Sequence, residues 1–489
     1  MQTSINFELK DNQLIKKSSY INGTWHSSNT QFSVTNPATG DVVQVDNAGV
    51  TEAELAIISA KNALKMWSAK SANERAGLLR NWFNLIMENQ DDLGRILTLE
   101  QGKPLIEAKG EIAYGASFIE WFAEEGKRVY GDVIPAPSGD KKLIVIKQPV
   151  GVVASITPWN FPNAMIARKA AAALAAGCTF VVRPSELTPL SALAMAELAE
   201  RAGIPAGVFN VVVGKDAHGI GEVLTQHPDV AKFTFTGSTQ VGKILLKQCA
   251  TSVKKVSMEL GGNAPFIVFN DADIDAAVQG AMVSKFRNAG QTCICANRIF
   301  VQKGVLDEFT EKFVAAVNTL KVGNGLTTGV TIGPMISEKA VNNVETLVNQ
   351  SVLAGAKIRT GGTKHTSGDS FFLPTILTNV TNDMPIAVNE IFGPVSPIIA
   401  FDTEENVIEM ANNTEYGLAA YFYSRDIGTI WRVAEGLEFG LVGINEGLIS
   451  NAATPFGGVK QSGNGREGSK YGLDDYLEIK YLCMGGLDK

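Results

Sequence analysis

The chain has little histidine and cysteine for its 489 residues, and it has no excess of positive charge. The four histidines stand in polar, loop-like stretches without an HExxH or paired spacing, which argues against a histidine-based metal site or a Cys–His hydrolase. Five cysteines are too few for a disulfide-rich scaffold. The net charge of −7 argues against nucleic acids and anionic membranes as partners. We therefore expect no metal and no nucleic acid.

The sequence shows no pattern typical of a targeting or membrane-spanning segment. Its first residues, MQTSINFELKDNQLIKK, have neither the apolar core of a signal peptide nor the arginine-rich pattern of a transit peptide. No apolar run reaches the ~20 residues of a membrane span. The best candidate, residues 164–182, is interrupted by Arg168 and Lys169. We expect a cytoplasmic protein without a membrane partner.

Strand-like and helical stretches alternate from residue 150 onwards. The apolar runs VGVVASITP, TFVVRP, VFNVVVG and VAKFTFTG are separated by helical patterns, which is typical of a parallel sheet covered on both faces. Such sheets bind ligands at the carboxyl ends of their strands. A second α/β unit extends from about residue 265 to residue 463. We expect the active site in the cleft between the two units.

Three further segments have patterns of their own. Residues 73–101 carry apolar side chains at helical spacing and predict one long helix. Residues 132–149 and 476–482 alternate with period 2 and predict strands, the first of them a protruding hairpin. Exposed strands of this kind are either sheet edges or oligomer contacts, because an unpaired edge favours pairing with another chain.

Cys293 lies in the stretch FRNAGQTCICANR, between a helical pattern and a strand-like one. A thiol at such a junction is accessible while its backbone is held by the flanking elements. Cysteine is the best side-chain nucleophile near neutral pH once its thiolate forms. A lone cysteine, however, is more often a small buried hydrophobe.

Three other loops follow predicted strands. The run Gly237–Gly242 opens a helix, where backbone N–H groups can bind phosphate, although an ordinary strand–helix turn would look the same. Glu259 ends an apolar strand and can serve as a general base or be a solvated strand-end charge. Asn160, between two prolines, can donate to a developing oxyanion.

Taken together, these motifs resemble the aldehyde dehydrogenase superfamily over about residues 15–485. The motifs occur in the same order as in that family: TPWNFP, FTGSTQVG, ELGGNAP, GQTCICANR, EIFGPV and PFGGVKQSGNGRE. Within this superfamily, the chain most resembles the succinate-semialdehyde dehydrogenase branch. The segments that carry this resemblance are SKFRNAGQTCICANR, GLISN and GREGSKYGLDDYLEIKY.

The resemblance implies an α/β fold with two Rossmann-like domains and a β-hairpin oligomerisation element. It implies an NAD(P)-binding domain from residues 1–131 and 151–262, and a catalytic domain from residues 263–463. Residues 132–150 and 464–489 would form the oligomerisation element of a homo-oligomer, either a dimer or a tetramer.

The resemblance also implies the catalytic residues. Cys293 would attack the aldehyde, and the amide of Asn160, together with the N–H of Cys293, would hold the oxyanion. Hydride transfer would leave a thioester, which water activated by Glu259 would hydrolyse. Lys169 matches a family lysine that is sometimes assigned to proton relay.

For the cofactor, the resemblance implies NAD or NADP. The implied binding residues are Thr157, Pro158, Trp159, Arg183, Ser185, Glu186, Gly214, Gly237, Ser238, Gly242, Leu260, Glu390 and Phe392. The family commonly has Lys-Pro-Ala/Ser at the adenosine ribose, where this chain has Arg183-Pro184-Ser185-Glu186. Glu186 would repel a 2′-phosphate and slightly favour NAD, whereas Arg183 could pair with that phosphate.

For the substrate, the resemblance implies succinic semialdehyde, whose carboxylate Arg168, Arg287 and Ser450 would bind. Each arginine could instead belong to a structural ion pair. Glutarate semialdehyde, a broad range of aldehydes, and a non-catalytic binding or structural role are the alternatives. Cys295 could close a regulatory disulfide with Cys293 under oxidation, or it could be a packed bystander thiol.

Overall fold

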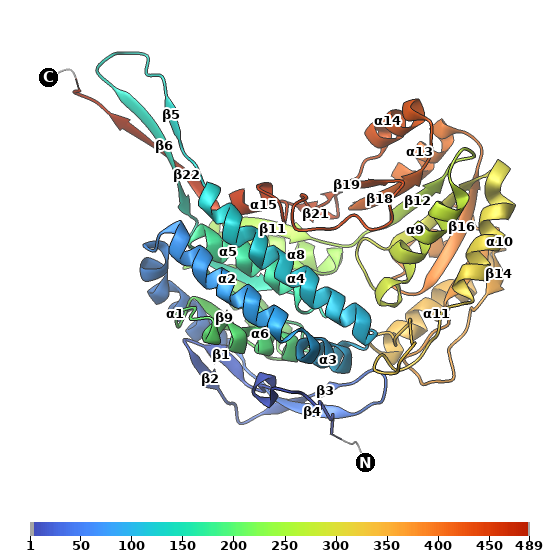
Figure 1. The fold of residues 1–489 in the computed structure, drawn as a ribbon, viewed down its shortest axis with the longest axis horizontal. Coiled ribbons are helices and arrows are strands. Elements are labelled where there is room, and N and C mark those ends of the chain that lie inside the picture. Colours follow the sequence, from blue (N-terminus) through green and yellow to red (C-terminus); the bar gives the residue numbers. More distant parts are fainter. Residues whose placement is uncertain (1–3, 488–489) are drawn as a thin grey trace.

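The computed structural model of the chain describes residues 4–487, so residues 1–3 and 488–489 of the predicted domains lie outside the described part. Two α/β bodies lie side by side, and a β-arm extends away from the first of them (Figure 1). This architecture confirms the predicted fold class.

The first body is built on an eight-stranded sheet with the order β2-β1-β9-β8-β7-β10-β11-β21. The central strands of this sheet, β9, β8, β7, β10 and β11, are parallel to one another. The strands are β1 (Ser19–Ile21), β2 (Thr24–His26), β7 (Val152–Ile156), β8 (Thr179–Arg183), β9 (Phe209–Val211), β10 (Val230–Thr236), β11 (Lys255–Glu259) and β21 (Gly463–Asn464).

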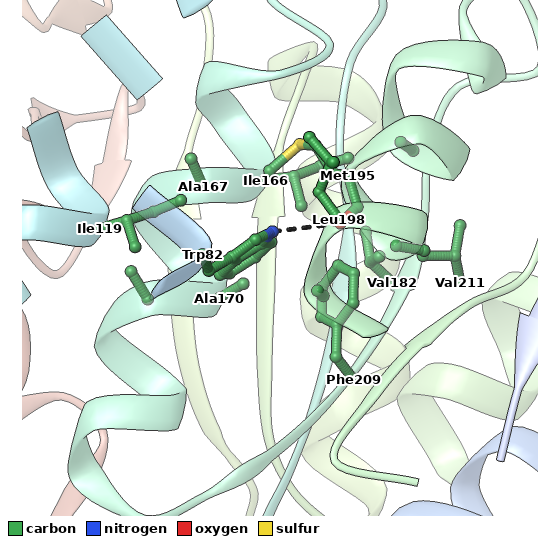
Figure 2. Packing of buried hydrophobic residues seen from close by; sticks show 14 of the residues in the cluster. Trp82, Ile119, Ile166, Ala167, Ala170, Val182, Met195, Leu198, Phe209 and Val211 are labelled. Atoms are coloured by element: carbon green, nitrogen blue, oxygen red, sulfur yellow. Dashed lines mark hydrogen bonds between the residues drawn. The ribbon is translucent and has the colours of Figure 1, made fainter. Parts of the chain in front are cut away.

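Helices cover both faces of this sheet. They are α1 (Val50–Ser68), α2 (Ala72–Glu88), α3 (Gln90–Gln101), α4 (Leu105–Glu125), α5 (Ala164–Ala176), α6 (Pro189–Arg201), α7 (Ala217–Gln226) and α8 (Thr239–Cys249). Along β8, Phe180 belongs to one apolar core and the next residue, Val181, to the core on the other face. In the first core, the indole of Trp82 packs 5.3 Å from the ring of Phe209 and donates to the carbonyl of Met195 at 3.1 Å (Figure 2).

The second body contains a seven-stranded sheet with the order β14-β15-β16-β13-β12-β18-β19, parallel except for β14. Its strands are β12 (Ala264–Val268), β13 (Ala296–Gln302), β14 (Lys357–Thr360), β15 (Thr375–Thr378), β16 (Val395–Phe401), β18 (Ala419–Tyr423) and β19 (Leu441–Ile444). Its helices are α9 (Ile274–Phe286), α10 (Leu306–Val317), α11 (Glu338–Leu353), α12 (Pro385–Val388), α13 (Glu404–Asn412) and α14 (Ile427–Gly436).

Small elements complete the chain: β3 (Gln31–Thr35) pairs with β4 (Val42–Asp46), β17 (Tyr416–Gly417) pairs with β20 (Val459–Lys460), and α15 (Tyr471–Asp474) precedes the last strand. Strand β21 pairs antiparallel with β11, so residues 463–464 join the first sheet. These residues straddle the predicted boundary between the catalytic domain and the oligomerisation element. The chain thus returns from the second body to the first beside the end of β11.

The arm is a three-stranded sheet of β5 (Asp132–Ile134), β6 (Lys142–Pro149) and β22 (Leu477–Met484). Both segments predicted as exposed strands are therefore present, and they pair with each other within one chain. On β22 the side chains of Ile479 and Tyr481 are 73% and 57% exposed. The assignment of this arm to oligomer contacts remains a prediction.

The prediction of one helix over residues 73–101 is wrong, because Asn89 separates α2 from α3. Asn89 has ψ 17°, and its side-chain amide donates to the carbonyl of Leu85 at 2.8 Å. A short polar side chain that hydrogen-bonds a nearby backbone carbonyl in this way competes with the hydrogen bonds that would continue the helix. The apolar periodicity continues across the break, which is why the sequence pattern does not reveal it.

Candidate active site

A cavity of about 260 Å³ contains most of the predicted site residues. Its walls come from the loops after β7 and β10, from α5, and from the Cys293 loop and neighbouring loops of the second body. Among the predicted residues, the lining includes Pro158, Trp159, Asn160, Arg168, Gly237, Ser238, Leu260, Arg287, Cys293, Glu390, Phe392 and Ser450. Segments that are far apart in sequence therefore meet at one site.

Cys293 lies in the turn between α9 and β13. Before it, Asn288 and Ala289 have φ 53° and 54°, so the chain bends sharply into the loop. The backbone of Cys293 packs against Gly262, where a Cβ would come within 2.4 Å of the Cys293 carbonyl oxygen. Burial raises the pKa of the Cys293 thiol to about 12, and the positive charge of Arg168 opposes this shift. The resting group is therefore the thiol, and catalysis requires its deprotonation.

Asn160 faces the same cavity and is buried. Its Nδ2 donates to the carbonyl of Gln291 at 2.9 Å, which fixes the orientation of the amide. An amide nitrogen carries two N–H groups, and this hydrogen bond uses one of them. The amide thus has a second N–H, which could donate a hydrogen bond to an oxyanion formed at Cys293.

Glu259 ends β11 and is 2% exposed. Within the described part of the chain, its Oε2 has no hydrogen-bond partner. Burial, followed by the negative charge of Glu467, raises the pKa of Glu259 well above its ordinary value. Glu259 is thus a buried carboxyl of raised pKa at the end of a strand, and its role as the general base remains a prediction.

Glu467 was not singled out from the sequence, although it lies at the centre of a buried charge cluster. It pairs with both Arg168 and Lys169, and all three side chains are at most 4% exposed. Burial by itself would raise the pKa of Glu467, but these two cations lower it. Lys169 also donates to the hydroxyl of Thr234 at 3.0 Å. The only sequence signal for Glu467 was its place in the family-like run GREGSK.

Arg168 lines the cavity in addition to pairing with Glu467. Its guanidinium lies 4.3 Å from the ring centre of Phe456, and its Nη2 has no hydrogen-bond partner among residues 4–487. Arg168 therefore forms the structural ion pair and keeps donor capacity at the cavity, and its role in substrate binding remains a prediction.

Arg287 and Ser450 also line the cavity, as predicted for substrate binding. The Arg287 guanidinium lies 5.3 Å from the ring centre of Phe161. The Ser450 hydroxyl hydrogen-bonds the hydroxyl of Tyr114. Tyr114 belongs to α4 and was missed in the sequence, because helical periodicity alone does not distinguish a cavity-lining tyrosine from a packing one.

The predicted phosphate-binding turn lies at the start of α8. Ser238 is the N-cap of this helix, and its hydroxyl accepts from the N–H of Val241 at 3.4 Å. At Gly242 a Cβ would come within 2.4 Å of the Leu260 side chain. The glycine thus permits close packing of the helix against the ELGG loop, and the helix N-terminus favours a negatively charged group.

Glu390 and Phe392 form the part of the cavity predicted to hold the nicotinamide riboside. The Glu390 carboxylate accepts from the N–H of Gly262 at 2.9 Å, and burial raises the pKa of Glu390 to about 7. Phe392 has φ 47° and meets Trp159 edge to face at a centroid distance of 5.6 Å.

Arg183 and Glu186 lie outside the residues that line the cavity and pair with each other at 2.9 Å. Arg183 also donates to the carbonyl of Gly214 at 3.0 Å, and its own carbonyl accepts from the N–H of Thr157 at 3.2 Å. Ser185 is buried nearby, and its hydroxyl accepts from the N–H of Leu187 at 3.2 Å. Hydrogen bonds and the ion pair therefore connect Arg183 to Thr157, Glu186 and Gly214.

Cys295 is buried, and its thiol donates to the carbonyl of Lys285 at 3.4 Å. It does not line the cavity that contains Cys293. Both cysteines are free thiols in the structure. The disulfide between them remains a prediction.

Residues 4–487 contain no group of three or more His, Cys, Asp or Glu side chains arranged to hold a metal ion. No helix in this part of the chain is long and apolar enough to cross a membrane.

Fold and site together define an α/β protein in which Cys293 lines the same cavity as the turn at Gly237 and Ser238. Residues 25–482 match the model of the aldehyde dehydrogenase family, and the chain belongs to that family. It is an NAD(P)-dependent aldehyde dehydrogenase, as the resemblance implied.

Similar proteins carry several substrate names. The chain is 61% identical to 3-sulfolactaldehyde dehydrogenase of Pseudomonas putida, over 99% of this chain and 100% of that protein. It is 60% identical to the NADP(+) succinate-semialdehyde dehydrogenase of Escherichia coli, over 98% and 100%. It is 59% identical to glutarate-semialdehyde dehydrogenase of Pseudomonas aeruginosa, also over 98% and 100%.

Solved structures agree with this assignment. Succinate-semialdehyde dehydrogenase from Burkholderia pseudomallei has a TM-score of 0.97 and 57% identity, covering 98% of this chain and 100% of that one. Betaine aldehyde dehydrogenase from Staphylococcus aureus, solved in complex with NAD+, has a TM-score of 0.94 and 36% identity, covering 97% and 96%.

Proposed function

We propose that the protein oxidises succinic semialdehyde to succinate with NAD or NADP. The observation that carries this proposal is one cavity with a nucleophile and an oxyanion donor, Cys293 and Asn160, together with two guanidinium groups, those of Arg168 and Arg287. An aldehyde with a distal carboxylate needs both sets of groups, because a carboxylate is costly to desolvate without cationic partners.

In the proposed reaction, the thiolate of Cys293 adds to the aldehyde carbon and forms a thiohemiacetal. The oxyanion receives hydrogen bonds from the second N–H of Asn160 and from the backbone N–H of Cys293. Because burial raises the pKa of Cys293, the thiol proton must leave before attack. We assign the transfer of this proton to solvent water, and we assign the Glu259 carboxylate, itself of raised pKa, to the hydrolysis step.

The residues present fit a dinucleotide cofactor. The turn at Gly237 and Ser238, which lines the cavity, and the N-terminus of α8 suit a pyrophosphate, and we assign this group to Gly237, Ser238 and Gly242. Glu390 and Phe392 would hold the nicotinamide riboside. When bound there, NAD(P)+ would supply the hydride acceptor, and Cys293 would then carry the acyl group as a thioester.

Water then attacks the thioester carbonyl and gives succinate and the free thiol. Glu259 takes the proton from this water, and its negative charge is stabilised by nearby Arg168 and Lys169. The proton can pass towards the Glu467–Lys169 pair, in keeping with the relay role implied for Lys169.

The domain assignment follows the same proposal. We assign residues 1–131 and 151–262 to cofactor binding, residues 263–463 to the catalytic cysteine, and residues 132–150 and 464–489 to oligomerisation. The last assignment is supported by β22, which is an edge strand of the β-arm and carries exposed apolar side chains that a second copy could cover.

Glutarate semialdehyde is the second candidate, because a relative of 59% identity carries that name. Initial rates of reduced-cofactor formation with succinic semialdehyde, glutarate semialdehyde and butanal, each with NAD+ and NADP+, test the assignment. We expect kcat/KM for succinic semialdehyde to exceed that for butanal at least ~100-fold, about 2.7 kcal/mol. Near-equal values for these two substrates would contradict the proposed carboxylate site.

A further inference from the structure

Lys103 is a buried lysine next to the oxyanion donor. It lies between α3 and α4 and is 2% exposed. Its Nζ lies 2.6 Å from the Glu111 carboxylate, which is also buried, and donates to the backbone carbonyl of Asn160 at 2.8 Å. The same Nζ is 3.9 Å from the ring centre of Phe161. The ammonium group therefore contacts Asn160 and the residue that follows it.

Glu111 extends this contact to the end of the same loop. Its other carboxylate oxygen accepts from the N–H groups of Asn163 and Ala164 at 3.0 and 3.2 Å. The Lys103–Glu111 pair thus holds both ends of the segment from Asn160 to Ala164, where α5 begins. Because unpaired charges are costly to bury, the pair has little freedom to rearrange.

A second set of contacts ties Asn160 to the nucleophile loop. The side-chain amide of Asn288 donates to the Asn160 carbonyl at 3.0 Å and to the Gln291 carbonyl at 3.2 Å. The Asn160 amide donates to that same Gln291 carbonyl at 2.9 Å. Gln291 is two residues before Cys293, so these hydrogen bonds connect the Asn160 amide to the loop that carries the nucleophile.

We propose that Lys103 is a positioning residue that holds the Asn160 amide in the geometry required to stabilise the oxyanion at Cys293. This inference rests on the proposed roles of Cys293 and Asn160. It does not depend on which aldehyde is the substrate. Lys103 touches neither the substrate nor the cofactor in this account and acts through the backbone of Asn160.

The test compares two reactions of the Cys293 thiol in the full chain. Acylation by p-nitrophenyl acetate forms an oxyanion and needs no hydride transfer, whereas alkylation by iodoacetamide forms none. For Lys103→Met we expect the acylation burst to slow ~10–100-fold, less than the ~100–1000-fold typical for complete loss of an oxyanion donor, because the Asn160 amide is misplaced and not removed. We expect the alkylation rate to stay within ~2-fold of wild type, because displacement at saturated carbon does not use the amide.

A double-mutant cycle with Asn160→Ala separates positioning from general damage. If Lys103 acts through Asn160, Lys103→Met should cause no further loss of acylation in the Asn160→Ala background. Losses that multiply, or a parallel fall in alkylation, would overturn the proposal. Lys16→Met is the matched control, since it removes a lysine 2.8 Å from Glu197 that does not line the cavity, and it should leave both rates unchanged.

A second variant keeps the test decisive if Lys103→Met does not fold. Glu111→Gln retains the shape and one acceptor of the carboxylate but weakens its hold on Lys103. We expect a smaller loss of acylation, ~2–10-fold, which also vanishes in the Asn160→Ala background. Unchanged acylation in Glu111→Gln and in any folded Lys103 variant would refute the inference. If Asn160→Ala itself acylated at the wild-type rate, the proposed oxyanion role of Asn160 would fail instead.

Discussion

Arg168 and Glu467 form an ion pair in which both side chains are almost completely buried, at the wall of the cavity that holds Cys293. Glu467 therefore offsets much of the positive charge that Arg168 brings to the site. Among the ion pairs described for residues 4–487, none involves Arg287. We infer that Arg287 supplies the larger share of the net charge available to a substrate carboxylate.

Arg287→Met should therefore impair charged aldehydes selectively. Removing one charge-assisted contact costs about 1.5–3 kcal/mol, so kcat/KM for succinic semialdehyde should fall ~10–150-fold, mainly through KM. The value for butanal should change little, because butanal has no group for the arginine to bind. Equal losses for both aldehydes in steady-state kinetics would assign Arg287 to the structure of the loop instead.

Glu467→Gln should destabilise the fold. The change leaves Arg168 and Lys169 buried without their shared carboxylate, and breaking a buried ion pair from one side costs about 3–5 kcal/mol. Denaturant unfolding monitored by fluorescence measures this loss. Glu438→Gln, which removes the partner of Lys460 at the surface, is the control and should cost less than about 1 kcal/mol. A stable Glu467→Gln protein would show that the two cations find other partners.

Thioester hydrolysis should accelerate with pH. Burial and the charge of Glu467 raise the pKa of Glu259 above its ordinary value of 4.5, so the carboxyl is protonated at low pH and becomes a base as pH rises through that raised pKa. Single-turnover decay of the acyl-enzyme at several pH values measures this. In Glu259→Gln the decay should be slow and lack this pH dependence. A wild-type rate that is flat with pH above the ordinary carboxyl range would exclude Glu259 as the base.

Glu186→Gln should shift cofactor preference towards NADP. Arg183 now pairs with the Glu186 carboxylate at 2.9 Å, and neutralising that carboxylate frees the guanidinium for a 2′-phosphate and removes a repulsive charge. We expect the ratio of kcat/KM for NADP+ over NAD+ to rise ~10-fold or more, about 1.4 kcal/mol. An unchanged ratio would mean that neither residue contacts the ribose region.

Much of the site was predictable because parallel sheets present their functional loops at strand ends. Asn160 and Gly237 each follow a strand that the apolar pattern identified, Glu259 ends such a strand, and Cys293 stands before one. Family motifs then related these loops to one another. The structure places Asn160, Gly237 and Cys293 in one cavity, and it leaves Glu259 buried outside the residues that line this cavity.

The charges that organise the site were less predictable, because their partners are distant in sequence. Lys169 and Glu467 are 298 positions apart, and Lys103 reaches Asn160 across 57 positions. No periodicity links such pairs, and a buried lysine in QGKP looks like a turn residue. Likewise, the break at Asn89 depends on one side-chain hydrogen bond rather than on the apolar pattern.

The most direct test of the account is mass spectrometry of Glu259→Gln, quenched after mixing with succinic semialdehyde and NAD(P)+. We predict one equivalent of reduced cofactor and a succinyl group on the peptide that contains Cys293, because acylation proceeds while hydrolysis is slow. Cys293→Ala should give neither signal. If Glu259→Gln, with a thiol that still reacts with iodoacetamide, showed no cofactor burst and no adduct, the proposed thioester route through Cys293 would be contradicted.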